Sequence, residues 1–408
     1  MQNTLFTNDN LFVLYGMNSE IADLIYLDPP FNSKRMYSAP VGTKAAGASF
    51  KDMWTWDDIN EAYLDKLIDK YSGIVNFIRS IEEMHSKGMM AYVTYMTQRI
   101  IEMHRVLKPT GSFYLHCDPT ASHYLKILLD EIFGRNNFRN EIIWCYRGAG
   151  YPKKDFGKRH DVIFRYSKSD DYYFDLDAVR EPYAEATVER FKHHIGNKRG
   201  GRDFGAQTLH PLGKQPDDWW QIQPIAPSAK ERTGYPTQKP LALLHRIIKA
   251  SSKEGDLVLD PFCGCATTCV AAQQLGRKWI GIDIEKQAAS VLVERLGDDA
   301  GLFTDFIHLT QPPQRTDVKI ELPNKSIKQQ LYTQQKGHCN ACDVALDIGL
   351  FEIDHIVPKA KGGGDYYENY QLLCSLCNRI KGDRPMEYLR TKIKTRLDAL
   401  RSKITFGL

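Results

Sequence analysis

The stretch Ala22-Asp23-Leu24-Ile25-Tyr26-Leu27-Asp28-Pro29-Pro30-Phe31 decides the fold. Its apolar run, bounded by an aspartate and by two prolines, predicts a strand buried on both faces of a parallel sheet. The strand should end where the prolines remove backbone hydrogen-bond donors. Asp28 and Phe31 follow at its carboxyl end, where open α/β sheets bind their ligands. A buried strand closed by a proline turn would explain the apolar run but not the choice of Asp28 and Phe31.

The composition is that of a globular protein. The 408 residues are 42% hydrophobic and 25% charged, which suffices for two or three domains. The net charge of +4 is mild, so affinity for nucleic acid has to come from local patches. No apolar run approaches the ~18 residues of a membrane span, and the first residues do not resemble a secretion signal. We therefore expect a soluble, intracellular protein without a membrane partner.

Strand and helix patterns alternate along the first three quarters of the chain. Helical spacing covers about 60 to 107, a turn is expected at 105–111, and further helices are expected at 123–133 and 240–251. Short apolar runs at 112–116, 141–146 and 162–166 predict strands. This alternation predicts a Rossmann-like α/β sheet.

A second strand with a small-residue turn lies further along. The strand 256–260 runs into Pro261-Phe262-Cys263-Gly264-Cys265-Ala266-Thr267-Thr268 and then into a helix. Such a turn forms a Rossmann-type cofactor cradle, because small residues let a ligand approach the backbone. The strand 278–283 ends in Asp283, at the distance expected for an acid that accepts hydrogen bonds from ribose hydroxyls.

Residues 147–214 lose the alternation and predict an inserted recognition segment. The window 190–202 within it contains no acid, and it holds Arg190, Lys192, His193, His194, Lys198, Arg199 and Arg202. Charge runs are usually solvated loops, but inside an enzyme that handles nucleic acid we favour contacts with phosphates. A proline-rich linker at 311–330 then separates a domain of residues 1–310 from a module of residues 331–408.

The first domain resembles the S-adenosylmethionine-dependent amino-DNA methyltransferases, in the permuted order that places the catalytic motif before the cofactor motif. The resemblance rests on Asp28-Pro29-Pro30-Phe31 and Asp260-Pro261-Phe262-Cys263-Gly264, and it covers about residues 11–300. Three further stretches resemble family signatures: 116–122, 140–144 and 235–240. They are most similar to adenine-N6 enzymes akin to type III modification subunits. One departure is Ala266, where the family often has a second glycine.

The resemblance implies a role for each matching residue. Asp28 and the Pro29 carbonyl, in the Asp28–Phe31 motif, would accept the amino hydrogens of a flipped adenine, and Phe31 would stack on its ring. The cofactor pocket would be lined by Asp260, Pro261, Phe262 and Gly264, with Thr267 and Lys239 at the methionine end and Asp283 at the ribose. Adenine is favoured because cytosine-N4 enzymes of the family tend to carry Ser-Pro-Pro.

The C-terminal module carries two thiol pairs, Cys339/Cys342 and Cys374/Cys377, which form the natural ligand set of a tetrahedral structural zinc site. With Asp354-His355, Asn369 and Asn378 interleaved, residues 331–385 resemble the zinc-containing HNH endonucleases. The resemblance implies His355 as general base and Asn369 as the residue that orients it. It also implies a catalytic divalent metal, magnesium or similar, on Asp354 and Asn378. Asn378 stands where many members of the family have histidine.

We therefore expect a methyltransferase acting on N6 of adenine in double-stranded DNA, joined to a ββα nuclease in restriction-modification or defence. The alternative is a methyltransferase, for adenine N6 or cytosine N4, whose zinc module only binds DNA or a partner. Nine basic residues against three acids from Leu376 onward support DNA contact by a basic C-terminal helix in either case. A homodimer and a location on the nucleoid of a prokaryotic or phage-like system are further expectations.

Overall fold

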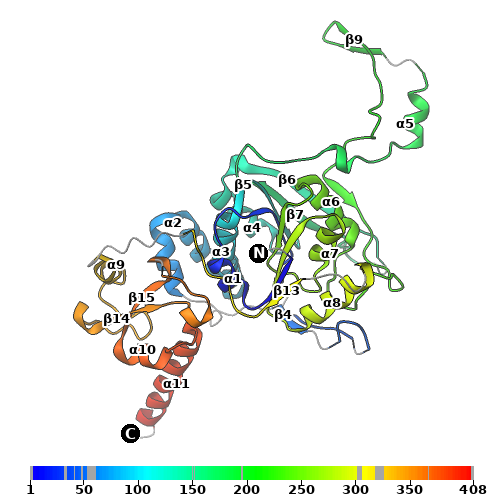
Figure 1. Ribbon diagram of the computed structural model, residues 1–408. Coiled ribbons are helices and arrows are strands. Elements are labelled where there is room, and N and C mark those ends of the chain that lie inside the picture. Colours follow the sequence, from blue (N-terminus) through cyan, green and yellow to red (C-terminus); the bar gives the residue numbers. More distant parts are fainter. Residues whose placement is uncertain are drawn as a thin grey trace.

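The computed structural model (Figure 1) describes residues 3–31, 35–40, 42–46, 49–52, 61–148, 150, 152–193, 196–300, 306–317, 326–365 and 367–405. His194, the side chains of Lys198 and Arg199, and residues 318–325 of the predicted linker lie outside this part. Within it, no helix is both long and apolar enough to cross a membrane.

A nine-stranded sheet organises the first 310 residues, in the order β10-β6-β7-β5-β2-β11-β12-β1-β13. Strand β7 is antiparallel to both of its neighbours, and the other neighbouring pairs of this sheet are parallel. The strands are β1 (Thr4–Thr7), β2 (Ala22–Leu27), β5 (Leu107–Cys117), β6 (Phe138–Cys145), β7 (His160–Ser167), β10 (Trp219–Gln221), β11 (Leu257–Asp260), β12 (Lys278–Asp283) and β13 (Ile307–Leu309). The predicted α/β class is confirmed.

Two apolar cores cover the two faces of this sheet. Strand β2 serves both, because Ile25 and Leu27 join the core under one set of helices while Leu24 and Tyr26 join the other. The first set is α1 (Asn10–Gly16), α2 (Glu61–Met84), α3 (Lys87–Val106) and α4 (Ser122–Phe133). The second set is α6 (Leu241–Ser251), α7 (Thr267–Gln274) and α8 (Gln287–Ala300). The strand predicted to be buried on both faces is therefore buried on both.

Several elements differ from the sequence-based expectation. Strand β5 begins at Leu107, inside the predicted turn, because β2 offers it a partner as early as Ala22. The predicted helical region is two helices, and Ser86 caps the second by accepting from the Met89 amide at 3.2 Å. The short elements β1, α1, β10 and β13 were not predicted.

The predicted inserted segment is not one insertion, because β7 within it belongs to the central sheet. It divides into a loop between β6 and β7 and a second excursion after β7. That excursion carries α5 (Glu185–Arg190), β8 (Gly196–Arg199) and β9 (Arg202–Ala206), and Figure 1 shows it projecting away from the sheet. A further hairpin pairs β3 (Arg35–Ser38) with β4 (Ser49–Asp52).

The C-terminal module is the predicted ββα unit. Antiparallel β14 (Phe351–His355) and β15 (Tyr370–Cys374) lead into α10 (Ser375–Lys381), and α11 (Met386–Thr405) ends the described chain. Helix α9 (Ser326–Gln334) packs Leu331 into the same core, so it begins inside the range predicted as linker. Short 3₁₀ turns lie at Arg135–Asn137, Asp177–Val179, Ile348–Leu350, Lys359–Lys361 and Tyr367–Asn369.

The first part of the predicted linker is held against the methyltransferase-like domain. The Ser19 amide donates to Asp317 at 2.7 Å, and Thr316 exchanges hydrogen bonds with Asn18 at 2.8 Å. Arg315 also contacts Asp317 and holds the pKa of that carboxyl below its usual range against the opposing effect of burial. Residues 315–317 of the predicted linker are therefore fixed to the first domain and do not act as a spacer.

Candidate active sites

Asp28 stands at the carboxyl end of β2 with its two oxygens in different states. Oδ2 forms an ion pair with Lys239 Nζ. Oδ1 is buried and finds no hydrogen-bond partner among the described residues. A buried carboxylate oxygen without a partner is unfavourable in an isolated protein, so its presence indicates a ligand that donates to it. Lys239 is 8% exposed and its Nζ lies 5.4 Å from the Phe31 ring centroid, so the predicted residues Asp28, Phe31 and Lys239 do come together.

The imidazole ring of His116 stacks behind the ring of Phe31. The two ring centroids are 6.1 Å apart with an interplanar angle of 30°. Both nitrogens of the fully buried His116 have partners, Tyr26 OH at 2.9 Å from Nδ1 and Asp161 Oδ2 at 3.2 Å from Nε2. Because two anchors fix the imidazole, Phe31 rests against a wall whose orientation is set. His116 was noted only as part of a signature, and its burial gave no signal in the sequence.

The turn after β11 is held by the tip of β12. The Gly264 amide donates to Asp283 Oδ2 at 2.7 Å, and the Glu285 amide donates to Oδ1 at 2.8 Å. Gly264 has φ +51°, and Ala266 has φ +58°, in the left-handed region that favours glycine. Glycine at the position of Ala266 would adopt this conformation without strain. The methyl group adds strain but the turn keeps its form.

Asp260 ends β11 beneath the turn. Thr268 Oγ1 donates to Asp260 Oδ2 at 2.5 Å, and the Phe262 amide donates to Oδ1 at 3.0 Å. Burial raises the pKa of Asp260 to about 7 and the pKa of Asp283 to about 6, although these hydrogen bonds act in the opposite direction. Two buried acids side by side suit a ligand that donates hydroxyl or amino hydrogens.

A cavity of about 270 Å³ connects the Asp28 end of β2 with the turn after β11. It is lined by all the predicted residues of the first domain, namely Asp28, Pro29, Pro30, Phe31, Lys239, Asp260, Pro261, Phe262, Gly264, Thr267 and Asp283. Asn10 and Tyr95, which the sequence analysis did not single out, also line it, as does Tyr235, which was noted only as part of the signature at 235–240. Asn10 begins the short helix α1, and Tyr95 lies on α3, where its position on the predicted helix gave no sign of a site.

Second partners hold the lining in place. Asn10 Nδ2 donates to the Pro261 carbonyl at 2.7 Å, and Arg99 Nε donates to Asn10 Oδ1 at 2.6 Å. Arg295, which is buried, donates to Thr267 Oγ1 at 2.9 Å and to the Cys265 carbonyl at 2.7 Å. Helices on both faces of the sheet thus fix the same turn.

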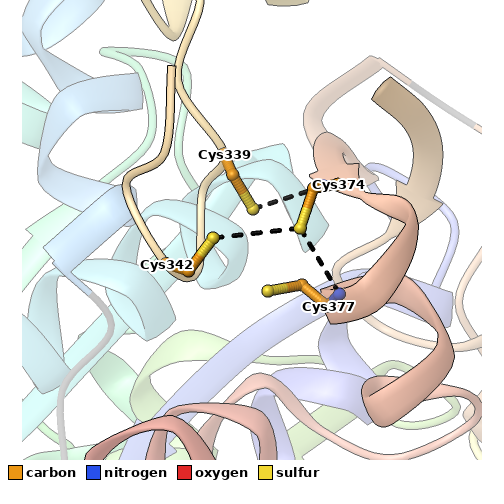
Figure 2. A group of neighbouring side chains, drawn as sticks. All are labelled: Cys339, Cys342, Cys374 and Cys377. Carbon is orange, nitrogen blue, oxygen red and sulfur yellow. Dashed lines mark hydrogen bonds between the residues drawn. The ribbon is translucent and has the colours of Figure 1, made fainter. Parts of the chain in front are cut away.

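Four cysteines form a compact cluster in the C-terminal module (Figure 2). The Sγ atoms of Cys339, Cys342, Cys374 and Cys377 all lie within 4.8 Å of one another. Four thiolates about 2.3 Å from a tetrahedral Zn²⁺ would be ~3.8 Å apart, which is the distance between the Sγ atoms of Cys342 and Cys374, 3.8 Å. The side chains point toward a common centre, so the set fits a structural zinc ion.

His355 ends β14, between the two cysteine pairs in sequence, and has an acidic partner. Its Nε2 lies 2.7 Å from Asp365 Oδ1, which also accepts from Tyr370 OH at 3.0 Å. Lys359 Nζ binds the other oxygen of Asp365 at 2.6 Å and, with these bonds, lowers the pKa of Asp365 to about 2. Asp365 therefore stays ionised and can orient the imidazole. It was missed because it lies ten residues from His355 in a glycine-rich loop.

Asn369 closes the loop that follows His355. Its side chain accepts from the Val357 amide at 2.8 Å and donates to the carbonyls of Val357, at 3.1 Å, and Gly364, at 2.9 Å. A Cβ at Gly363 would lie 1.8 Å from the Val357 carbonyl oxygen, so only glycine fits there. Asn369 therefore fixes the turn after His355, and its predicted role in orienting that histidine stays a prediction.

Asp354 and Asn378, the predicted metal ligands, have different partners. Asp354 is 9% exposed, and it contacts the fully buried Lys381 at 3.0 Å and Gln371 at 2.8 Å. Asn378 donates to Glu352. In the described part of the chain the four cysteines form the one group of three or more His, Cys, Asp and Glu ligand atoms close enough to share a metal. A divalent ion on Asp354 does not fit this arrangement unless Lys381 moves away.

The residues that build these two sites are those matched by two family models. Residues 22–294 match the DNA methylase model, and residues 339–384 match the HNH endonuclease model. The first match spans Asp28, the cofactor turn and Asp283, which together line one cavity. The chain belongs to the DNA methylase family. The second match gives this DNA methylase an HNH endonuclease domain, which contains the four-cysteine cluster.

Three known proteins illustrate what the methylase is similar to. It is 49% identical over 297 residues, 72% of this chain and 88% of the other, to the type II methyltransferase M2.LlaDCHI of Lactococcus lactis subsp. cremoris. It is 29% identical over 297 residues, 72% of this chain and 82% of the other, to the DNA adenine methyltransferase YhdJ of Escherichia coli (strain K12). The solved PvuII DNA methyltransferase (cytosine-N4-specific) matches 74% of this chain and 88% of that one, at 17% identity and a TM-score of 0.47.

The cavity of the methylase fits the cofactor that its family implies. Asp260 and Asp283 can accept hydrogen bonds, Lys239 can meet a carboxylate, and the unpartnered Oδ1 of Asp28 lies at the same cavity. S-adenosylmethionine carries hydroxyl and amino donors at one end and a carboxylate at the other. The donors and acceptors of the site therefore match the groups of the cofactor.

The pKa values of the two cofactor-site acids predict a pH dependence for the cofactor-free methylase. Unfolded aspartates ionise near pH ~4, whereas burial raises the pKa of Asp260 to about 7 in the fold. The folded state therefore binds more protons between these values, and the free energy of unfolding should decrease as pH rises through this window. Each extra bound proton contributes at most about 1.4 kcal/mol per pH unit. Urea unfolding at pH 5 and pH 7.5 measures the effect, and Asp260→Asn should reduce the difference; an unchanged difference would contradict this origin.

Proposed function

We propose that this DNA methylase transfers a methyl group to N6 of an adenine that is flipped out of double-stranded DNA. The observation that carries the proposal is Asp28, whose Oδ2 is held by Lys239 while its buried Oδ1 is left without a partner. An exocyclic amine is the kind of donor that this oxygen lacks. Phe31 beside it supplies a ring on which a base can stack.

The chemistry needs positioning more than covalent catalysis. The lone pair of the adenine amine is delocalised into the ring, so the amine is a poor nucleophile. Asp28 Oδ1 and the Pro29 carbonyl would accept its two hydrogens, which directs the lone pair away from the ring. Stacking on Phe31 is worth ~1–3 kcal/mol and offsets part of the few kcal/mol needed to flip a base. S-adenosylmethionine, when bound, supplies the methyl group on a sulfonium.

Lys239 would act at the junction of the two halves of the site. Its ammonium pairs with one oxygen of Asp28, which orients the other oxygen toward the amine. The same ammonium can meet the cofactor carboxylate together with Thr267. Asp283 would accept hydrogen bonds from the ribose hydroxyls, and Asp260 would hold the turn through Thr268 and the Phe262 amide.

Adenine is proposed over cytosine because Asp-Pro-Pro-aromatic goes with adenine in this family, whereas cytosine-N4 enzymes tend to carry Ser-Pro-Pro. The similarity to the DNA adenine methyltransferase YhdJ supports this choice. Methylome sequencing of DNA from cells that express the protein tests it. N6-methyladenine at one recurring sequence is expected, and N4-methylcytosine would overturn the assignment.

The HNH domain is proposed to hydrolyse DNA phosphodiester bonds. His355 would take a proton from the attacking water, and Asp365, held ionised, would orient it and stabilise its protonated form. Asn369 would keep the loop in place. A metal on Asp354 and Asn378 remains part of the proposal, with magnesium or a similar ion, and it requires Lys381 to leave Asp354.

Replacing His355 by alanine should reduce cleavage by ~10²–10⁴-fold, the usual contribution of a general base, and leave methylation unchanged. Supercoiled unmethylated plasmid with added Mg²⁺ or Mn²⁺ provides the assay. His338→Ala is the matched control, because this histidine lies in the same module and contacts Asp343 instead. Equal cleavage by wild type and His355→Ala would contradict the role. No cleavage by wild type with either metal would favour the alternative, a zinc module that only binds DNA or a partner.

Together the two domains suggest restriction-modification or defence. Methylation would mark the host DNA, and cleavage would be kept for unmodified DNA. A DNA substrate would place the protein at the nucleoid of a prokaryotic or phage-like system. A homodimer is proposed as its assembly, testable by light scattering of the full chain.

A further inference from the structure

The loop between β6 and β7 exposes an aromatic side chain at its tip. Phe156 is 99% exposed, the highest value among the large hydrophobic side chains of the described part of the chain. Burying a phenylalanine usually contributes about 1.5–3 kcal/mol, which this residue forgoes in the isolated protein. Five basic residues and one acid, Asp155, accompany it between residues 146 and 159. The basic residues are Arg147, Lys153, Lys154, Lys158 and Arg159. An apolar ring amid cations is suited to a polyanion with apolar surfaces between its charges, which describes DNA.

The sheet topology places this loop at the edge of the sheet that holds Asp28. Strand β6 ends at Cys145, which pairs with His160 at the start of β7. Strand β7 pairs Val162 with Cys117 at the end of β5, and β5 pairs with β2 just before Asp28. The carboxyl ends of β2, β5 and β6 therefore share one edge, and the loop leaves the sheet there.

Both ends of the loop connect to the wall behind Phe31. Tyr146 OH donates to Asp161 Oδ1 at 3.4 Å, which joins the two ends. The other oxygen of Asp161 contacts His116, and His116 stacks on Phe31. Phe156 lies four positions before His160, so the tip can reach ~13 Å from the sheet. This exceeds the ~8.5 Å depth of the major groove.

We propose that Phe156 inserts into the DNA stack at the position that the target base leaves when it flips. The proposal rests on the proposed base flipping and adds the residue that fills the gap. Extrusion of a base leaves two neighbouring bases without a stacking partner, and an aromatic wedge restores part of that stacking. The basic residues around Phe156 would contact the flanking phosphates, and they would set affinity without reading sequence.

Fluorescence of 2-aminopurine placed at the target adenine tests this inference, on a duplex with the sequence found by methylome sequencing and with S-adenosylhomocysteine present. Wild type should give a rise in fluorescence. Phe156→Ala should lower the flipping equilibrium about 5- to 150-fold, the range expected from one lost stack, while Phe156→Trp should restore it. Ile307→Ala is the matched control. Ile307 is an exposed apolar residue on β13, the outermost strand on the side of the sheet away from β6.

A second duplex separates a wedge from a structural role. Opposite an abasic site the target base is already poorly held, so the defect of Phe156→Ala should shrink there. A defect of equal size on both duplexes, or no defect on either, would overturn the wedge. If wild type itself gave no fluorescence change and no methylation, the proposed function would fail instead, and the two failures are distinct.

Discussion

Alanine in place of Asp28 is expected to lower the rate of DNA methylation by at least ~10²–10³-fold, the usual effect of removing one group that stabilises a transition state. The variant loses the Asp28 carboxylate, which is both the acceptor for the amine and the counter-ion of Lys239. The amine then keeps its lone pair in the ring, and a buried ammonium remains without a counter-ion. Transfer of a radiolabelled methyl group to plasmid DNA measures the rate.

The control for this variant is Asp23→Asn. Asp23 lies on the same strand, at the opposite end of the sheet from the cavity, and it binds Lys108 at 2.7 Å and the Leu257 amide at 2.9 Å. Its replacement should affect stability by about 1 kcal/mol and leave the rate per folded molecule unchanged. Cofactor binding by Asp28→Ala, measured by calorimetry, should persist because Asp260 and Asp283 remain. A methylation rate within threefold of wild type would refute the assigned role of Asp28.

Removal of zinc should unfold the HNH domain and spare the methylase domain. The domain has a small apolar core around Leu331, Leu372 and Leu389, and structural zinc in small domains contributes about 10–16 kcal/mol of apparent binding free energy at pH 7. Cys374→Ala or a chelator should therefore expose residues 326–405 to rapid hydrogen exchange. Exchange in β2 and β11 should not change.

The matched cysteine control is Cys145→Ala, at the end of β6 outside the cluster. Atomic emission should find one zinc ion per chain in this variant, as in wild type. If the chelated protein kept slow exchange across β14 and β15, the four thiols would not be a stabilising metal site. If methylation were lost in parallel, the two domains would not fold independently.

The residue pattern of a single segment was sufficient to predict an element when its structure depends on neighbouring residues alone. The strand before Asp28 and the turn after Asp260 were predicted in place, because apolar runs and small residues act over a few positions. The same holds for the two thiol pairs. Strands β1 and β13 are too short for such a signal. The apolar run at 162–166 predicted β7 as a strand, but the range 147–214 was also predicted as an insertion, and the place of β7 in the central sheet between β5 and β6 was not predicted.

Some of the predicted sites changed meaning once their partners were visible. Lys381 was counted among the basic residues of the C-terminal tail, but it is buried against Asp354 and cannot contact DNA in this arrangement. The structure shows an acidic partner for His355, Asp365, and it pairs Asn378 with Glu352. These pairings join residues across a hairpin and a helix, which sequence spacing does not predict.

The sequence by itself determined the order of the two domains, the residues at the end of β2 and in the turn after β11, and the two cysteine pairs of the C-terminal module. Each of these depends on residue types within a short stretch, whose backbone preferences and chemistry are local. Only the tertiary structure decided that Lys239 binds one oxygen of Asp28 and leaves the other without a partner, and that the Phe156 loop shares an edge with that carboxylate. Both depend on how strands distant in sequence pair in one sheet, and that pairing is set by the burial of the whole core.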